Sequence, residues 1–237
     1  MSGDDVEAWL GEIPGGPYPF PTALERLYSP ADLYRGFDPD RPGTLRESFD
    51  ATVARWLTGG RPTPRRLSTS ETIAARLHDT SVDRLVAALV RQHRPSVAMM
   101  GSHSISRGHP AFRQFALIAR ELHRRGYLVI SGGGPGLMEA ANFGAFLAPC
   151  ADEVLDEALD ILKRPPCNWN GEDWLASAAR SRAFVLRRMP GLGQDADWTT
   201  LAPHAACNLG VPTWYYGREP PNLFATHVGK YFFNSLR

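Results

Sequence analysis

The chain has 237 residues, of which 43% are hydrophobic and 22% are charged, and its formal net charge at pH 7 is +1. The length allows one large domain, or one domain with an appendage, and the apolar content is ordinary for a globular protein. A nearly neutral chain has no general electrostatic attraction to nucleic acid, and no apolar run approaches the roughly 20 residues that span a bilayer. We therefore expect neither a nucleic acid nor a membrane as a partner.

The first 64 residues are rich in proline and glycine, which disfavours long regular elements. They also carry many large apolar side chains, too many for a disordered tail. We expect an irregular arm that packs on the main domain or on a partner chain, with one helix over 45–57. The amino terminus is acidic and lacks the apolar stretch of a signal peptide, so a cytoplasmic location is expected.

Two capping-box patterns follow the arm. Ser68 to Glu71 predicts a helix that runs to about His78, and Thr80 to Asp83 predicts the start of a second helix. The second helix carries its apolar side chains on one stripe and leads directly into a strand. We therefore expect residues 1–94 to form an irregular and helical extension, and residues 95–237 to form the main domain.

The main domain begins with a strand–helix–strand pattern. Ser96 to Met100 and Tyr127 to Ile130 are short apolar runs that predict strands, and the second has the length and composition of a buried strand. The helix between them starts near Pro110 and ends before Gly126, which suits a helix C-cap. This order predicts two parallel strands joined by a right-handed connection.

Each of these strands ends in a loop of small residues, Gly101 to Ser104 and Gly132 to Gly136. The second loop runs directly into a helix that starts at Leu137. Free amides and the positive dipole end at the start of such a helix attract an anion. Both loops are expected at the carboxyl edge of the sheet, where ligands of parallel α/β proteins bind. The alternative is a tight turn without a ligand.

The glycine loop does not follow the common nucleotide-binding patterns. The third glycine of the dinucleotide fingerprint would fall at Leu137, and no glycine–lysine–serine or –threonine follows the turn. An NAD-dependent oxidoreductase and a P-loop ATPase are therefore disfavoured, and we expect no cofactor. Further along the chain we expect helices over 152–163 and 171–188, a loop over 189–197, a strand over 211–216 and a helix over 222–235.

The loop GSHS at 101–104 and the stretch SGGGPGLMEAAN at 131–142 resemble the lonely-guy (LOG) family, as does the segment 209–237. Its characterised members are nucleoside 5′-monophosphate phosphoribohydrolases, which cleave the base from ribose 5-phosphate. The resemblance covers about 95–237 and implies a Rossmann-like, three-layer fold with a parallel sheet. It also implies a nucleoside monophosphate or phosphorylated sugar as the ligand, and assembly into a homo-oligomer.

The chain departs from this family in one respect. The second family signature, a proline-glycine-glycine-x-glycine-threonine stretch followed by glutamate, is absent. The chain ends about where that signature is expected, so we expect a truncated domain whose sheet is incomplete at the C-terminus, or a naturally degenerate copy of the family's domain. Glu139 is then the best-placed carboxylate for hydrolysis, and Arg237 is nearest in position to the family's catalytic arginine. The alternative is a catalytically inactive nucleotide-binding or interaction module.

The residues expected to bind the ligand belong to the two loops and the start of the following helix. They are Gly101, Ser102, His103, Gly132, Gly133, Gly134, Pro135, Gly136, Met138 and Asn142. For Glu139 the alternative is a favourable interaction with the helix dipole, and for Asn142 it is helix packing. For Ser102 and Ser104 the alternative is turn capping, and for His103 it is simple exposure.

The other residues with chemical potential show no convincing pattern. The histidines have no metal-ligand spacing, so no metal site is expected. The three cysteines are widely spaced, which argues against disulfides and fits a reducing compartment; they are Cys150, Cys167 and Cys207. Three consecutive aromatic side chains could stack on a base or pack in the core, and these are Trp214, Tyr215 and Tyr216.

Overall fold

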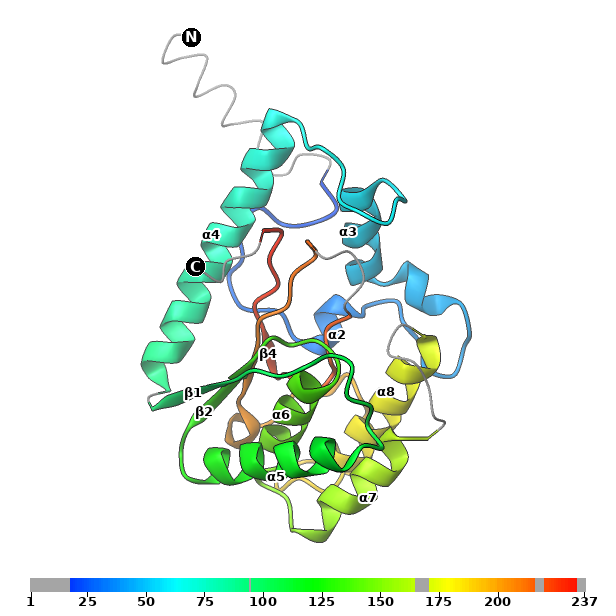
Figure 1. The fold of residues 1–237 in the computed structure, drawn as a ribbon, viewed down its shortest axis with the longest axis vertical. Helices are drawn as coiled ribbons and strands as arrows, with labels where there is room; N and C mark the ends of the chain where they lie inside the picture. Colours follow the sequence, from blue (N-terminus) through cyan, green and yellow to red (C-terminus); the bar gives the residue numbers. More distant parts are fainter. Residues whose placement is uncertain (1–17, 94, 165–170, 216–219, 234–237) are drawn as a thin grey trace.

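The computed structural model describes residues 18–93, 95–164, 171–215 and 220–233. Within these residues, helices flank a four-stranded sheet whose strands are all parallel and lie in the order β1-β2-β3-β4 (Figure 1). The strands are β1 (Ser96–Met99), β2 (Leu128–Ser131), β3 (Leu209–Gly210) and β4 (His227–Val228). This arrangement is mixed α/β and is compatible with a Rossmann-like fold.

The strand–helix–strand prediction is confirmed. Strands β1 and β2 pair in parallel, with Ser96 opposite Leu128 and Met99 opposite Ser131. Helix α5 (Pro110–Arg124) connects them, with proline in its first turn and Gly126 just beyond its end at a φ of 86°. Helix α6 (Leu137–Phe146) follows the glycine loop, as expected.

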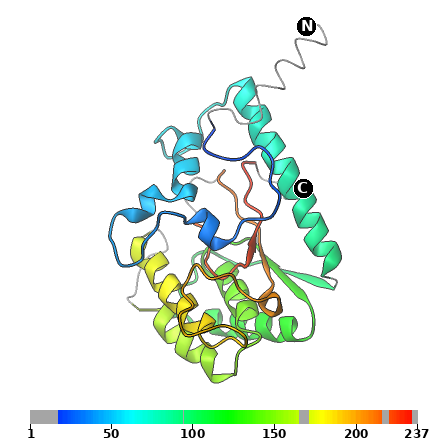
Figure 2. The ribbon, with the colours of Figure 1, turned by 180° about the vertical axis from the view of Figure 1, so that it is seen from behind.

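The two faces of the sheet are covered by different helices (Figures 1 and 2). Leu128 and Ile130 face the long helix α4 (Thr69–Gln92), whereas Val129 packs with residues of α5 and α6. The side chains alternate between faces because successive residues of a strand point in opposite directions. Helices α7 (Glu153–Leu162) and α8 (Glu172–Leu186) lie beyond α5 and α6 and confirm two further predicted helices.

The described part of the N-terminal arm packs against the rest of the fold. It contains α2 (Pro30–Leu33), the 3₁₀ turn η1 (Thr44–Glu47) and α3 (Phe49–Thr58). The predicted single helix over 45–57 is interrupted at Ser48, which is extended and caps α3 through its hydroxyl. Tyr28 pairs antiparallel with Val228 of β4, and most of the arm's buried side chains join one core cluster with those of α6 to α8.

Helix α4 corrects the prediction of two separate helices. It is one continuous element, and the second capping pattern lies in its interior. There the Thr80 hydroxyl donates to Arg76 O at 2.8 Å, and the Ser81 hydroxyl donates to His78 O at 2.7 Å. Both hydroxyls bond back to the preceding turn, which lets hydroxyl residues remain inside a helix. None of the described helices is long and apolar enough to cross a membrane.

Within the described residues the predicted helix over 222–235 is wrong, and the predicted strand over 211–216 keeps only a parallel bridge between Thr213 and Tyr231. Strand β3 ends at Gly210, before Pro212, which cannot donate a ladder hydrogen bond. The predicted helix is instead a turn followed by β4, because the Asn222 carboxamide oxygen accepts from the amides of Phe224 and Ala225. The ends of the two predicted elements, at Tyr216 and at 234–235, lie outside the described residues.

Candidate functional site at the carboxyl edge of β1 and β2

The loops that follow β1 and β2 touch each other. The Leu137 amide, the first of α6, donates to Ser102 O at 3.0 Å. Gly136 has a φ of 70°, and a Cβ there would clash with Ser102 O and come within 2.8 Å of the His103 backbone. Glycine is therefore required at 136 both by the backbone conformation and by the close approach of the neighbouring loop.

On its other side, the glycine loop closely contacts the segment at the end of β3. Gly133 has a φ of 72°, and a Cβ there would lie 2.7 Å from Pro212 Cδ and 3.0 Å from Val211 N. Its amide donates to Ser131 Oγ at 2.9 Å. The whole stretch 133–136 is buried. Packing thus accounts for the glycines at 133 and 136, and the exposed part of this edge lies in the loop after β1.

That exposed loop presents two hydroxyl groups beside the start of α6. Ser102, His103 and Ser104 are all exposed. The two serine Oγ atoms lie 2.7 Å apart, and the Ser104 amide donates to Ser102 Oγ at 3.1 Å. The half-buried Met138 donates its amide to no acceptor among the described residues. Hydroxyl donors next to a helix N-terminus form an arrangement that can hold an anion.

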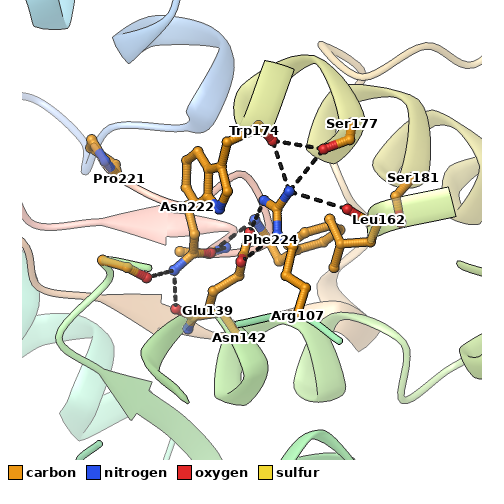
Figure 3. Close-up of polar contacts among 12 residues, drawn as sticks. Arg107, Glu139, Asn142, Leu162, Trp174, Ser177, Ser181, Pro221, Asn222 and Phe224 are labelled. Atoms are coloured by element: carbon orange, nitrogen blue, oxygen red, sulfur yellow. Dashed lines mark hydrogen bonds and ion pairs between the residues drawn. The ribbon is translucent and has the colours of Figure 1, made fainter. Parts of the chain in front are cut away.

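Glu139 lies in the first turn of α6 and is fully buried. Its carboxylate accepts two hydrogen bonds from Arg107, at 2.8 Å from Nε and 2.5 Å from Nη2 (Figure 3). Burial raises the pKa of the Glu139 carboxyl, and the Arg107 guanidinium opposes that rise. Both carboxylate oxygens are thus engaged, so neither faces an open site in this conformation.

Arg107 was not singled out by the sequence. Its Nη1 donates to Leu162 O, Trp174 O and Ser177 Oγ, and its guanidinium lies 4.5 Å from the Trp174 ring (Figure 3). The pair therefore ties the loop after β1 to α6, α7 and α8. The only available signal was a lone arginine in a loop, which does not distinguish a buried ion pair from a solvated side chain.

Asn142 is fully buried in a network of side chains. Its Oδ1 accepts from Ser131 Oγ at 2.7 Å and from Asn222 Nδ2 at 2.8 Å, and its Nδ2 donates to Asn208 Oδ1 at 2.9 Å. Asn222 also donates to the carbonyls of Gly133 and Gly134. These contacts favour the packing alternative for Asn142, and they fix the glycine loop to the segments around β3 and β4.

The remaining candidates lie elsewhere. Trp214 is buried and donates to Asp50 Oδ1 at 2.8 Å, whereas Tyr215 is 48% exposed. Arg237 and Tyr216 lie outside the described residues. In the part of the chain that the structure describes, no group of three or more His, Cys, Asp or Glu residues is placed to hold a metal ion.

The fold and this edge define an α/β protein with a parallel, Rossmann-like sheet and contacting small-residue loops after its first two strands. Comparison with known proteins finds no family model and no curated protein that matches the chain. The similarity to the LOG family therefore stays a prediction from its motifs.

Proposed function

We propose that the carboxyl edge of β1 and β2 binds the phosphate of a nucleoside 5′-monophosphate or of a phosphorylated sugar. The observation that carries this proposal is the hydrogen bond from the Leu137 amide to Ser102 O, at 3.0 Å. It places the exposed hydroxyl loop directly against the first turn of α6. Two serine hydroxyls, the Met138 amide and the helix dipole then favour the same negative group.

Hydrolysis of the N-glycosidic bond is a second, narrower proposal. It needs a carboxylate near the sugar to stabilise the developing positive charge, and an activated water. Glu139 is the carboxylate on the helix beside the loop, but Arg107 holds both of its oxygens in a buried pair. This observation favours a protein that binds the nucleotide without cleaving it through Glu139.

The binding proposal is tested by calorimetry with AMP, CMP, ribose 5-phosphate and adenosine. We expect the three phosphorylated compounds to bind and adenosine to bind much more weakly. A hydrogen bond to a charged group contributes roughly 1.5–3 kcal/mol, so the Ser102→Ala/Ser104→Ala variant should bind at least about tenfold more weakly. Equal affinity for AMP and adenosine, or an unchanged affinity in the double variant, would contradict the proposal.

Ser96→Ala is the matched control, because Ser96 is exposed and lies at the opposite end of β1. Its affinity for AMP should equal that of the unaltered protein. Chromatographic detection of free adenine or cytosine in the same samples separates binding from hydrolysis. Binding without release of base supports the non-catalytic function, and release of base supports the phosphoribohydrolase.

A further inference from the structure

Four of the seven histidines gather at the end of the sheet opposite the proposed ligand edge. His93 caps the end of α4, and His123 lies in the last turn of α5. His204 begins the 3₁₀ turn η2 (His204–Ala206), and His227 begins β4. Each lies at the amino end of a strand or in the segment just before one, so the parallel topology brings them together.

Two of the four histidines, His93 and His227, contact the Cys207 thiol. The His93 and His204 rings lie 4.8 Å apart between centroids. Cys207 Sγ is 3.9 Å from His93 Nε2 and 3.6 Å from His227 Nδ1. His123 Nε2 lies 2.8 Å from Ala205 O, and its buried Nδ1 has no hydrogen-bond partner among the described residues.

Burial, and to a lesser extent the neighbouring charges, disfavours protonation of His93 and His227. Burial lowers the pKa of His93, and the neighbouring His204 and His123 lower it further. Burial also lowers the pKa of His227, followed by the effects of His93, His204 and Arg26. Arg26 is itself paired with Asp32. Burial raises the pKa of the Cys207 thiol to about 11, so at neutral pH the thiol stays uncharged and offers no compensating negative charge.

We propose that this histidine cluster is a proton-sensitive joint. When its imidazoles are neutral it holds the end of α4, η2 and the start of β4 together, and when they are protonated their mutual repulsion loosens it. The cluster shares no residue with the loops of the proposed ligand site, so the joint does not depend on that function.

The direction of the pH effect follows from linkage. The pKa values of His93 and His227 in the folded protein lie below the ordinary value of 6.5, so the unfolded chain binds more protons. The stability that the neutral cluster contributes is complete above about pH 6.5. It is lost as the pH falls from 6.5 toward the folded-state pKa values. Each unit of difference between the folded-state and unfolded-state pKa of a histidine changes the unfolding equilibrium constant by up to about tenfold.

The direct test is an NMR titration of the imidazoles in the unaltered protein and in His204→Asn. Removing the His204 charge should raise the pKa of His93 toward 6.5. His109→Asn is the matched control, because His109 is exposed at the start of α5 and asparagine preserves the helix cap. A His93 pKa that is the same with and without His204 would overturn the proposal.

The second test compares urea unfolding at pH 7.5 and pH 5.5, with a chelator present. Over this range the unfolding constant of the unaltered protein should rise more than that of His93→Asn/His204→Asn, by up to about tenfold for each imidazole that the fold keeps neutral. Equal pH dependence in the two proteins would overturn the proposal.

If the variants do not fold, hydrogen exchange in the unaltered protein replaces them. The His227 amide donates to Asn208 O at 3.1 Å, next to the cluster. After correction for intrinsic exchange rates, its protection should fall at pH 5.5 while that of Ala140 in α6 is retained. Equal retention at both amides would count against a joint.

Discussion

Replacing Glu139 by alanine is expected to lower the free energy of unfolding by about 3–5 kcal/mol. The substitution leaves the guanidinium of Arg107 buried without its counter-charge, and only 7% of the Arg107 side chain is exposed. Removing one partner of such a pair costs more than the pair itself contributes, because the remaining ion must stay out of water. Urea denaturation followed by tryptophan fluorescence measures the effect.

The matched control is Glu121→Ala. Glu121 pairs with Arg125 on the surface of α5, and both side chains are more than half exposed, at 54% and 68%. Its loss should change the unfolding free energy by less than about 1 kcal/mol. In a double-mutant cycle, Arg107→Met/Glu139→Met should cost clearly less than the sum of the two single substitutions. Additive costs would show that the pair is not energetically coupled.

This destabilisation determines how a role of Glu139 in hydrolysis must be tested. An inactive Glu139→Ala protein could simply be unfolded. Glu139→Gln keeps the side-chain shape and one acceptor for Arg107. It therefore tests whether hydrolysis needs the negative charge of Glu139, with a smaller loss of stability. Full release of base by a folded Glu139→Gln protein would exclude Glu139 as the catalytic carboxylate.

Replacing Gly144 by alanine is expected to destabilise the protein by about 1–3 kcal/mol. Gly144 lies in α6 where that helix crosses α5, and a Cβ there would clash with Ala116 O and lie 2.7 Å from the carbonyl carbon. The obstacle is backbone, so the two helices must move apart. Helix propensity alone predicts the opposite, since alanine is favoured over glycine in a helix by about 1 kcal/mol.

Gly108→Ala provides the comparison for Gly144→Ala. Gly108 is exposed, has no positive φ, and has no atom within 4 Å of an added Cβ. Its replacement should be neutral or stabilise by up to about 1 kcal/mol, through the reduced freedom of the unfolded chain. The Tm should therefore fall for Gly144→Ala and stay unchanged or rise for Gly108→Ala. An increase in Tm for Gly144→Ala would contradict the described helix crossing.

The local sequence was sufficient to predict the helices and strands whose sequence patterns agree with their tertiary contacts. Strands β1 and β2 were visible as short apolar runs, and α5 as an apolar stripe with Pro110 at its start and Gly126 beyond its end. The glycine loop and the start of α6 followed from glycine spacing and helix-forming residues. Their parallel pairing followed because a strand–helix–strand connection has few acceptable topologies.

The same signals misled where a distant contact outweighed them. The capping pattern at Thr80 and Ser81 predicted a new helix start, yet their hydroxyls bond to the preceding turn of α4. The residues after Asn222 were predicted to form a helix, yet Val228 pairs with β3 on one side and with Tyr28 of the arm on the other. A pairing partner 200 positions away in the chain leaves no local pattern.

The sequence by itself determined the parallel α/β core and the two loops that meet at its edge, because propensity, periodicity and turn chemistry act over a few residues. Only the tertiary structure decided the environments of the polar side chains. Arg107 pairs with Glu139, Asn208 and Asn222 bind Asn142, and the His204 ring lies beside His93. In each case the partner is a residue far along the chain. The state of a buried polar group depends on its burial and its partners, and the fold supplies both.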